Sequence, residues 1–213
     1  MLTVKFVAGQ YSDLGSWNIV NLKYHITQDW SCFGESQLRS LKLYDDFHYY
    51  EVKGGVSYKF NKNLTLTLGA GTYQTYKEGG NFVLPKNNDE IRIWPQLILV
   101  QPLNNFKIEH RYRIENRFTS NGYKNRFRYR LGVSYAFGKK TESVHPYILG
   151  FQNEIFFTDR EPYFERNRLS FNLSHRFTKH SSLLIGYVHQ FDYKINDETG
   201  RDFFQIGYYF EFF

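Results

Sequence analysis

The chain has 213 residues, of which 20% are aromatic and 23% charged, and its formal net charge is +6. Polar residues interrupt every apolar run before it reaches 18 residues, which excludes a transmembrane helix. Cys32 is the only cysteine, so the sequence offers neither a disulfide framework nor a cysteine-based metal site. Basic residues alternate with aromatic residues, which indicates one face of a sheet rather than a patch that binds nucleic acid.

Segments with a period of two residues recur along the chain and are separated by residues typical of turns. They predict strands, in chain order, near residues 2–10, 16–26, 30–43, 47–60, 64–76, 89–101, 106–118, 124–137, 145–157, 163–177, 181–193 and 201–212. Strands that alternate apolar and polar residues cross an outer membrane without a long apolar run. We therefore expect a single domain over residues 1–213, an all-β closed antiparallel transmembrane barrel of about twelve strands.

The predicted connections differ in length at the two ends of this barrel. Short turns are expected at 27–29, 61–63, 103–105 and 178–180, and longer loops near 77–88 and 194–200. Short periplasmic turns and longer extracellular loops are typical of outer-membrane barrels, so we place the C-terminus in the periplasm. Met1 is not followed by the features of a signal peptide, and we expect the numbering to begin after a removed one.

The predicted strand at 30–43 has an unusual outer face. It carries Cys32, Gly34 and Ser36 where neighbouring strands carry Leu, Phe or Tyr. Small residues on a membrane-facing surface favour contact with another protein, so other outer-membrane proteins are possible partners. A β-bulge that shifts the register would instead turn these residues inward, and both interpretations remain open.

The strands at 106–118, 124–137 and 163–177 predict a basic interior. Their inward faces carry ten basic residues against two acidic ones, Glu109 and Glu115. Carboxylates that could compensate from other strands are Glu35, Glu51, Glu154, Asp192 and Glu211. Buried charges must be paired or hydrated. The residues expected to line a constriction are Arg111, Arg113, Glu115, Arg117, Arg126, Arg128, Arg130, Arg166 and Arg168.

The inward residues become small towards the predicted periplasmic ends of the strands. They are Gly55, Ser57, Thr65, Thr67, Gly132, Ser134, Ala136, Ser170 and Ser174, whereas the bulky charged residues lie in the middle and outer half. This taper predicts a roomy periplasmic vestibule below a charged constriction.

The strand at 201–212 resembles the assembly signal of bacterial outer-membrane barrels. Gln205, Gly207, Phe210 and Phe212 match its polar, glycine and two apolar positions, and the sequence closes on Phe213. The resemblance implies insertion into the lipid bilayer of the cell outer membrane by the barrel-assembly machinery. The alternative is an ordinary buried strand of a soluble sandwich.

Three further segments resemble DUF2490, a family of outer-membrane barrel proteins without an established activity. They are Ile108-Glu-His-Arg-Tyr-Arg-Ile-Glu-Asn-Arg117, Arg126-Phe-Arg-Tyr-Arg-Leu131 and Glu35-Ser-Gln-Leu-Arg39. The resemblance implies a fold and a compartment but no mechanism. A looser likeness, in strand number and basic interior only, is to the small acidic-oligosaccharide channels of enterobacteria.

Two functions fit these features. One is a narrow channel for small anionic solutes, because arginine binds carboxylate or phosphate through two hydrogen bonds. The other is a plugged barrel that serves as a structural or accessory subunit of a larger complex. We expect no enzymatic activity, cofactor or metal, because His110, His175 and His189 face outward without a visible serine partner.

Overall fold

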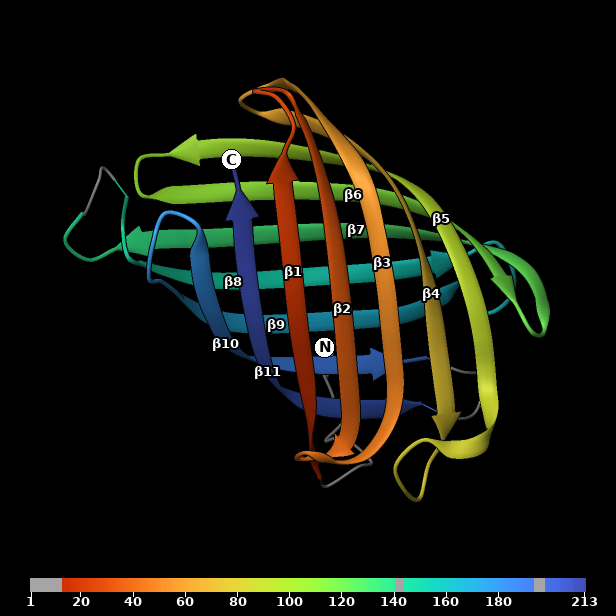
Figure 1. The fold of residues 1–213 in the computed structure, drawn as a ribbon. Coiled ribbons are helices and arrows are strands. Elements are labelled where there is room, and N and C mark those ends of the chain that lie inside the picture. Colours follow the sequence, from red (N-terminus) through yellow and green to blue (C-terminus); the bar gives the residue numbers. More distant parts are fainter. Residues whose placement is uncertain (1–12, 141–143, 194–197) are drawn as a thin grey trace, which may run out of the picture.

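The structure is a computed structural model that describes residues 13–140, 144–193 and 198–213. Its strands form a closed barrel, seen from the side in Figure 1. They are β1 (Leu14–His25), β2 (Trp30–Lys42), β3 (Asp45–Asn61), β4 (Leu64–Lys77), β5 (Val83–Leu103), β6 (Phe106–Thr119), β7 (Gly122–Phe137), β8 (Tyr147–Thr158), β9 (Phe164–Arg176), β10 (Ser181–Asp192) and β11 (Thr199–Phe212). Within these residues no helix is long and apolar enough to cross a membrane.

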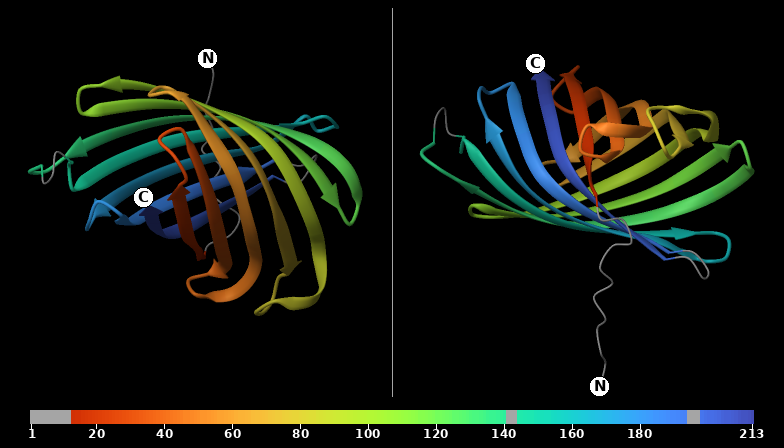
Figure 2. Two further views of the ribbon diagram at one scale, coloured as in Figure 1. Left: turned by 45° about the horizontal axis from the view of Figure 1, so that its top comes forward. Right: turned by 90° about the horizontal axis from the view of Figure 1, so that it is seen from below.

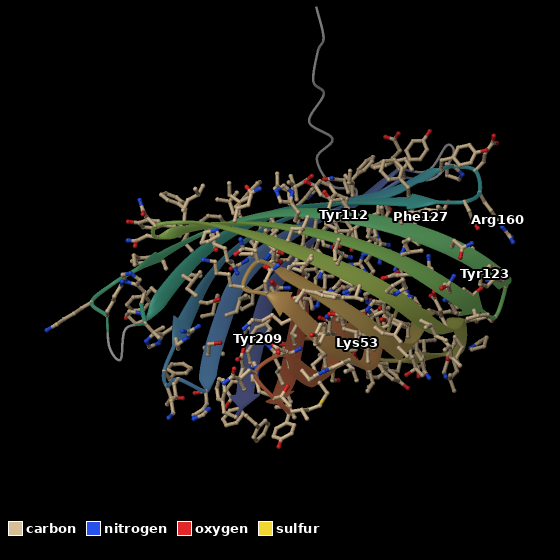
Figure 3. All side chains as sticks on the ribbon, turned by 90° about the horizontal axis from the view of Figure 1, so that it is seen from above. Lys53, Tyr112, Tyr123, Phe127, Arg160 and Tyr209 are labelled. Carbon is tan, nitrogen blue, oxygen red and sulfur yellow. The ribbon has the colours of Figure 1, made fainter. Side chains whose placement is uncertain are left out.

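Alternation of side chains along each strand gives the barrel an apolar outside and a polar inside. On β6, Tyr112, Ile114 and Phe118 are 45–49% exposed, whereas Glu115 and Arg117 between them are buried. Successive residues of a strand point to opposite faces, so this pattern requires one face outside and the other in the interior. Figure 3 labels Tyr112 and Phe127 among the exposed apolar residues and Lys53 and Tyr209 among those that line the interior.

The described residues form eleven strands, so the prediction of about twelve is corrected. The strand expected at 2–10 lies outside the described residues. The barrel closes without it, because β1 pairs with β11 in parallel from Leu14↔Asp202 to Tyr24↔Phe212. Every other neighbouring pair is antiparallel, and an odd number of alternating strands can close only through one parallel pair.

The short connections predicted at 27–29, 61–63, 103–105 and 178–180 all lie at the end that holds the C-terminus, but the expected difference in loop length is wrong. Residues 194–197 of the loop expected at 194–200 lie outside the described residues. Besides its predicted short turns, the end that holds the C-terminus carries the longest connection, 138–146. The opposite end has two-residue turns at 43–44 and 120–121. The loop expected at 77–88 is shorter because β5 begins at Val83, which pairs with Lys77 of β4.

The strands are strongly tilted, so those of the near wall (β1–β4) cross those of the far wall (β6–β9) in Figures 1 and 2. The main buried apolar cluster lies on the inner face of β1, β10 and β11. It contains Trp17, Ile19, Val188 and Phe203, with Tyr209 packed against it. The inner face of β6 and β7, across the barrel, carries charged residues instead. The interior therefore has an apolar side and a charged side.

Candidate functional site in the barrel interior

Among the described residues the interior holds a cavity towards each of its ends. The C-terminal cavity, at the end that holds the C-terminus, has a volume of about 440 Å³, and the distal cavity has about 470 Å³. Seven cationic side chains and two carboxylates line the C-terminal cavity: Lys23, Lys53, Arg111, Arg113, Arg128, Arg130 and Arg168 against Glu35 and Glu154. In the distal cavity the lining residues include eleven Lys and Arg against Glu51, Glu78, Glu90, Glu165 and Asp192. Both linings therefore carry a surplus of positive charge.

A layer of side chains, which we call the septum, lies between the two cavities. Its members border both of them and are Trp17, Gln37, Lys53, Arg113, Arg128 and Arg168. They come from β1, β2, β3, β6, β7 and β9, so the layer reaches across the barrel. A solute that passes from one cavity to the other must pass between these side chains.

Glu115 on β6 contacts the septum residues Arg113 and Arg128 and is fully buried, with a relative exposure of 0%. Arg126 is its direct neighbour on β7 and donates from Nε to Oε2 at 2.8 Å. Arg128 also donates to Glu115, and Nη1 atoms of Arg113 and Arg92 lie 3.4 and 3.9 Å from its oxygens. Four guanidinium groups thus surround one carboxylate, which compensates for its desolvation.

Glu154 on β8 is the second shared carboxylate. Arg111 donates to Oε1 at 2.5 Å and Arg128 at 2.8 Å, while Arg168 Nη1 lies 3.7 Å from Oε2. Through Arg128, the ion pairs of Glu154 and Glu115 form one network. Networks of this kind hold side chains in defined positions.

The remaining predicted basic residues also have acidic partners. Arg117 pairs with Glu90 and Glu165, Arg126 also pairs with Glu165, Arg130 pairs with Glu109 and Arg166 with Asp192. The interior is therefore cross-linked as well as basic.

Glu35, Glu51, Glu154 and Asp192, proposed from sequence as compensating carboxylates, line the cavities and form ion pairs there. Glu211 instead pairs with His25 at the C-terminal end of the barrel, 3.1 Å apart.

The nine residues predicted for the constriction all lie in the interior, but they do not form one ring. Arg113, Arg128 and Arg168 belong to the septum. Two of the others line only the C-terminal cavity, Arg111 and Arg130, and three only the distal cavity, Arg117, Arg126 and Arg166. The tilt of the strands spreads residues of similar sequence position over different depths.

Aromatic residues inside the barrel were missed by the sequence analysis. They are Trp17, Tyr49, Tyr73, Trp94, Phe156 and Phe203. Phe156 is 1% exposed, and the guanidinium carbons of Arg126, Arg128, Arg166 and Arg168 lie 4.6–5.7 Å from its ring centroid. A signal existed, because Phe156 lies two residues from inward Glu154 and so shares its face.

Glu165 was also missed, and here alternation could not have found it. It lies beside Arg166 on β9, so simple alternation would turn it outward. A register shift opposite Phe156 and Phe157 leaves Glu165 unpaired between Phe164 and Arg166. Such a bulge re-aims a side chain, and Glu165 lines the distal cavity within 3.1 Å of Arg126.

The predicted vestibule is present, but the expected taper is only half right. Ser57, Thr65, Thr67 and Ser170 line the C-terminal cavity, as expected for small inward residues. The distal cavity is equally large although charged side chains line it. Two of its arginines lie over aromatic rings, Arg92 over Tyr73 at 3.6 Å and Arg166 over Phe156 at 5.7 Å from the ring centroid.

The outer face of β2 is confirmed as a face of small residues. Cys32, Gly34 and Ser36 point outward, because Ser31, Phe33, Glu35 and Gln37 between them line the C-terminal cavity. The register shift on β2 falls between Arg39 and Ser40, beyond this segment. Gly34 pairs with Gly54 of β3, which pairs with Ala70 of β4, so the small face continues across three strands.

The three outward histidines have polar or aromatic neighbours. His110 lies 2.8 Å from the Tyr129 hydroxyl, His175 stacks on Tyr147, and His189 lies 2.7 Å from Asp202. The interpretation of these histidines as polar residues of the outer wall therefore fits their surroundings.

The residues of the predicted assembly signal lie on both faces of β11. Gln205 lines the C-terminal cavity, and the ring of Tyr209 lies over Gly207, where a Cβ atom would be 2.7 Å from it. Phe212 and Phe213 are exposed, and Phe213 stacks on His25 of β1 with a centroid distance of 4.6 Å. The end of β11 is thus tied to the neighbouring strand.

The chain matches the model of a protein family over residues 14–201, which covers β1 to the start of β11. The family is described as "Protein of unknown function (DUF2490)". The chain belongs to the DUF2490 family. No curated protein and no solved structure matches it. For this DUF2490 barrel, the case for a function therefore depends on the geometry of its interior and its outer wall.

Proposed function

We propose that this DUF2490 protein is an integral outer-membrane barrel. Its outer wall supports this, because large apolar residues are exposed on every strand, among them Val20, Leu68, Ile114, Phe151 and Phe171 at 46–62%. Water would disfavour so large an apolar surface, whereas lipid chains would cover it.

Two aromatic girdles give this apolar wall the height of a membrane. At the C-terminal end, Phe106, Tyr135, Phe137, Tyr147, His175 and Phe177 form a continuous series of ring contacts. At the opposite end, Phe118 contacts Tyr123 and Phe157 contacts Phe164. From Phe106 to Phe118, β6 covers about 40 Å, or about 30 Å across a membrane at the usual strand tilt.

We further propose that the interior is a narrow pathway for small anions. The observation that carries this proposal is the surplus of cations over carboxylates in both cavities. A low-dielectric wall focuses such a charge and raises the local concentration of anions. The septum sets the narrowest point, and an anion would cross it by replacing a carboxylate as the partner of Arg113, Arg128 or Arg168.

Solute uptake by proteoliposomes tests this pathway. Methanesulfonate and tetramethylammonium are small and permanently charged, so neither crosses lipid as a neutral molecule. We expect purified barrel to accelerate uptake of methanesulfonate well beyond that of tetramethylammonium, relative to liposomes without protein. Equal uptake of both ions, or uptake equal to that of empty liposomes, would reject an anion pathway.

A second candidate is a plugged structural barrel, favoured by the ion-pair network of the septum. Glu115, Phe156 and Trp17 are at most 4% exposed, and every predicted arginine has an acidic partner. In this function the small outer face of β2–β4 would contact another membrane protein. Permeability no greater than that of empty liposomes, with a correctly folded barrel, is the result that this candidate requires.

A further inference from the structure

The C-terminal cavity has two chemically different walls, and together they indicate which anions the pathway takes. One wall comes from β6–β9 and the other from β10, β11 and β1. In the strand order β6 and β7 lie across the barrel from β11 and β1, and the two walls meet where β9 pairs with β10. A solute in this cavity of about 440 Å³ therefore contacts both walls at once.

The cationic wall contains one register row with three arginines. Arg111 of β6 lies opposite Arg130 of β7, which lies opposite Glu154 of β8, which lies opposite Arg168 of β9. Like charges directly opposite one another on a sheet are unfavourable. Glu154 is the only carboxylate within this row, and the Nε of each of the three arginines has no hydrogen-bond partner among the described residues. The three arginines of this row therefore have more hydrogen-bond donors than the neighbouring protein groups accept.

The apolar wall is built from residues that line the same cavity. Ile19 of β1, Leu184 and Val188 of β10, and the ring of Tyr209 on β11 form its apolar part, and the same strands add polar Asn21, Lys23 and Gln205 to the lining. Ile19 and Val188 belong to the buried apolar cluster, against which Tyr209 packs. Apolar side chains offer a hydrated inorganic ion no hydrogen bonds, so this wall would not help the cavity to bind such an ion.

We infer that the C-terminal cavity binds amphipathic anions, small molecules with one anionic group and an apolar or aromatic body. The anionic group lies at the row of Arg111, Arg130 and Arg168, and the apolar body lies against Ile19, Leu184 and Tyr209. Charge-assisted hydrogen bonds hold the anionic group, and burial of apolar surface stabilises the apolar body. This inference rests on the proposed anion pathway and adds the class of solute.

Isothermal titration of the purified full-length barrel with two sulfonates tests the inference. Benzenesulfonate and methanesulfonate carry the same anionic group, and the phenyl ring adds apolar surface. We expect benzenesulfonate to bind at least about tenfold more tightly. Changing Leu184→Asn should reduce this preference to about twofold while leaving methanesulfonate binding unchanged.

Charge variants locate the site within the barrel. The double change Arg111→Gln and Arg130→Gln should weaken binding of both sulfonates by about tenfold or more. Lys124→Gln is the matched control, because Lys124 lines the distal cavity, and it should leave both affinities unchanged. Heat-modified mobility on gels checks that each variant is folded, because a closed barrel resists detergent.

Three results would overturn the inference. They are equal affinity for the two sulfonates, absence of benzenesulfonate binding to the folded wild type, and a preference for benzenesulfonate that Lys124→Gln alone abolishes. The anion pathway is judged separately, by uptake of methanesulfonate into proteoliposomes. Faster anion uptake with equal sulfonate affinities would retain the pathway and reject the amphipathic solute.

Discussion

At the scale of single residues, the interior depends on a few carboxylates that each hold several arginines. Glu115 is fully buried beside Arg126, Arg128, Arg113 and Arg92. Removal of one arginine leaves Glu115 three partners, whereas removal of the carboxylate leaves four like charges together. Loss of the carboxylate should therefore lower stability more than loss of one arginine, because an uncompensated buried charge is unfavourable.

Glu115→Gln should accordingly destabilise the barrel by about 3–5 kcal/mol. Arg128→Ala should cost less, about 1–3 kcal/mol, because Glu115 and Glu154 keep other partners. Glu109→Gln is the matched control, since Glu109 is 20% exposed and should change stability by about 0–1 kcal/mol. Denaturant unfolding in lipid vesicles measures all three. Equal losses for Glu115→Gln and Glu109→Gln would contradict the role of Glu115.

Gly69 on β4 gives a second prediction at this scale. A Cβ atom there would lie 2.5 Å from two ring carbons of Trp94, whose side chain is fully buried. Gly69→Ala should therefore destabilise the barrel by about 1–3 kcal/mol. At Gly34 a Cβ atom would meet nothing within 4 Å, so Gly34→Ala should be neutral or slightly stabilising. The same unfolding assay compares them, and equal effects would contradict the close packing of Trp94 on Gly69.

Much of the interior could be predicted from the sequence because alternation fixes which residues share a face. Arg111, Arg113, Arg126 and Arg128 were correctly placed inside on this basis alone. Which carboxylate each arginine contacts depends on the register between strands. Alternation along one strand gives no information about that register. The bulge that turns Glu165 inward also breaks the alternation itself.

At the scale of strands, the positions of ten of the eleven strands were predicted within a few residues at each end, because turn residues bound each period-2 segment. Strand β5 was the exception, expected at 89–101 and found at Val83–Leu103. Its first residues, Val83-Leu-Pro-Lys-Asn-Asn88, lack alternation, and on β4 only Lys77 and Thr75 pair with the two ends of this segment, across an irregularity in register. The closed barrel was predicted, but the parallel pairing of β1 with β11 that closes it was not, since it follows from the odd number of strands.

A cross-link tests the parallel closure directly. In a Cys32→Ser background, Val20→Cys on β1 and Tyr208→Cys on β11 place two thiols at paired positions on the outer face. Paired positions on neighbouring strands lie within the distance that a disulfide spans. We expect this pair to oxidise efficiently and the offset pair Val20→Cys with Phe210→Cys to oxidise poorly, as judged by mobility on gels. Preferential oxidation of the offset pair, or none of either, would contradict the register.

At the scale of the whole molecule, the proposed orientation places the turn at 120–121 outside the cell and the turn at 62–63 in the periplasm. Asn121→Cys, in the Cys32→Ser background, should react with an impermeant thiol reagent on intact cells. Lys62→Cys is the matched control at the opposite end, and it should react only after the outer membrane is permeabilised. Both residues are exposed in two-residue turns, so reagent access differs only through the membrane. The reverse pattern would invert the orientation.

The reversal potential of the purified barrel in a planar bilayer, under a potassium chloride gradient, tests the central claim most directly. The surplus of cations in both cavities predicts a reversal potential displaced towards the equilibrium potential of chloride. Arg128→Ala, which removes a septum cation, should reduce that displacement and increase the conductance. A displacement towards the equilibrium potential of potassium, or no current from the folded wild-type barrel, would contradict an anion pathway.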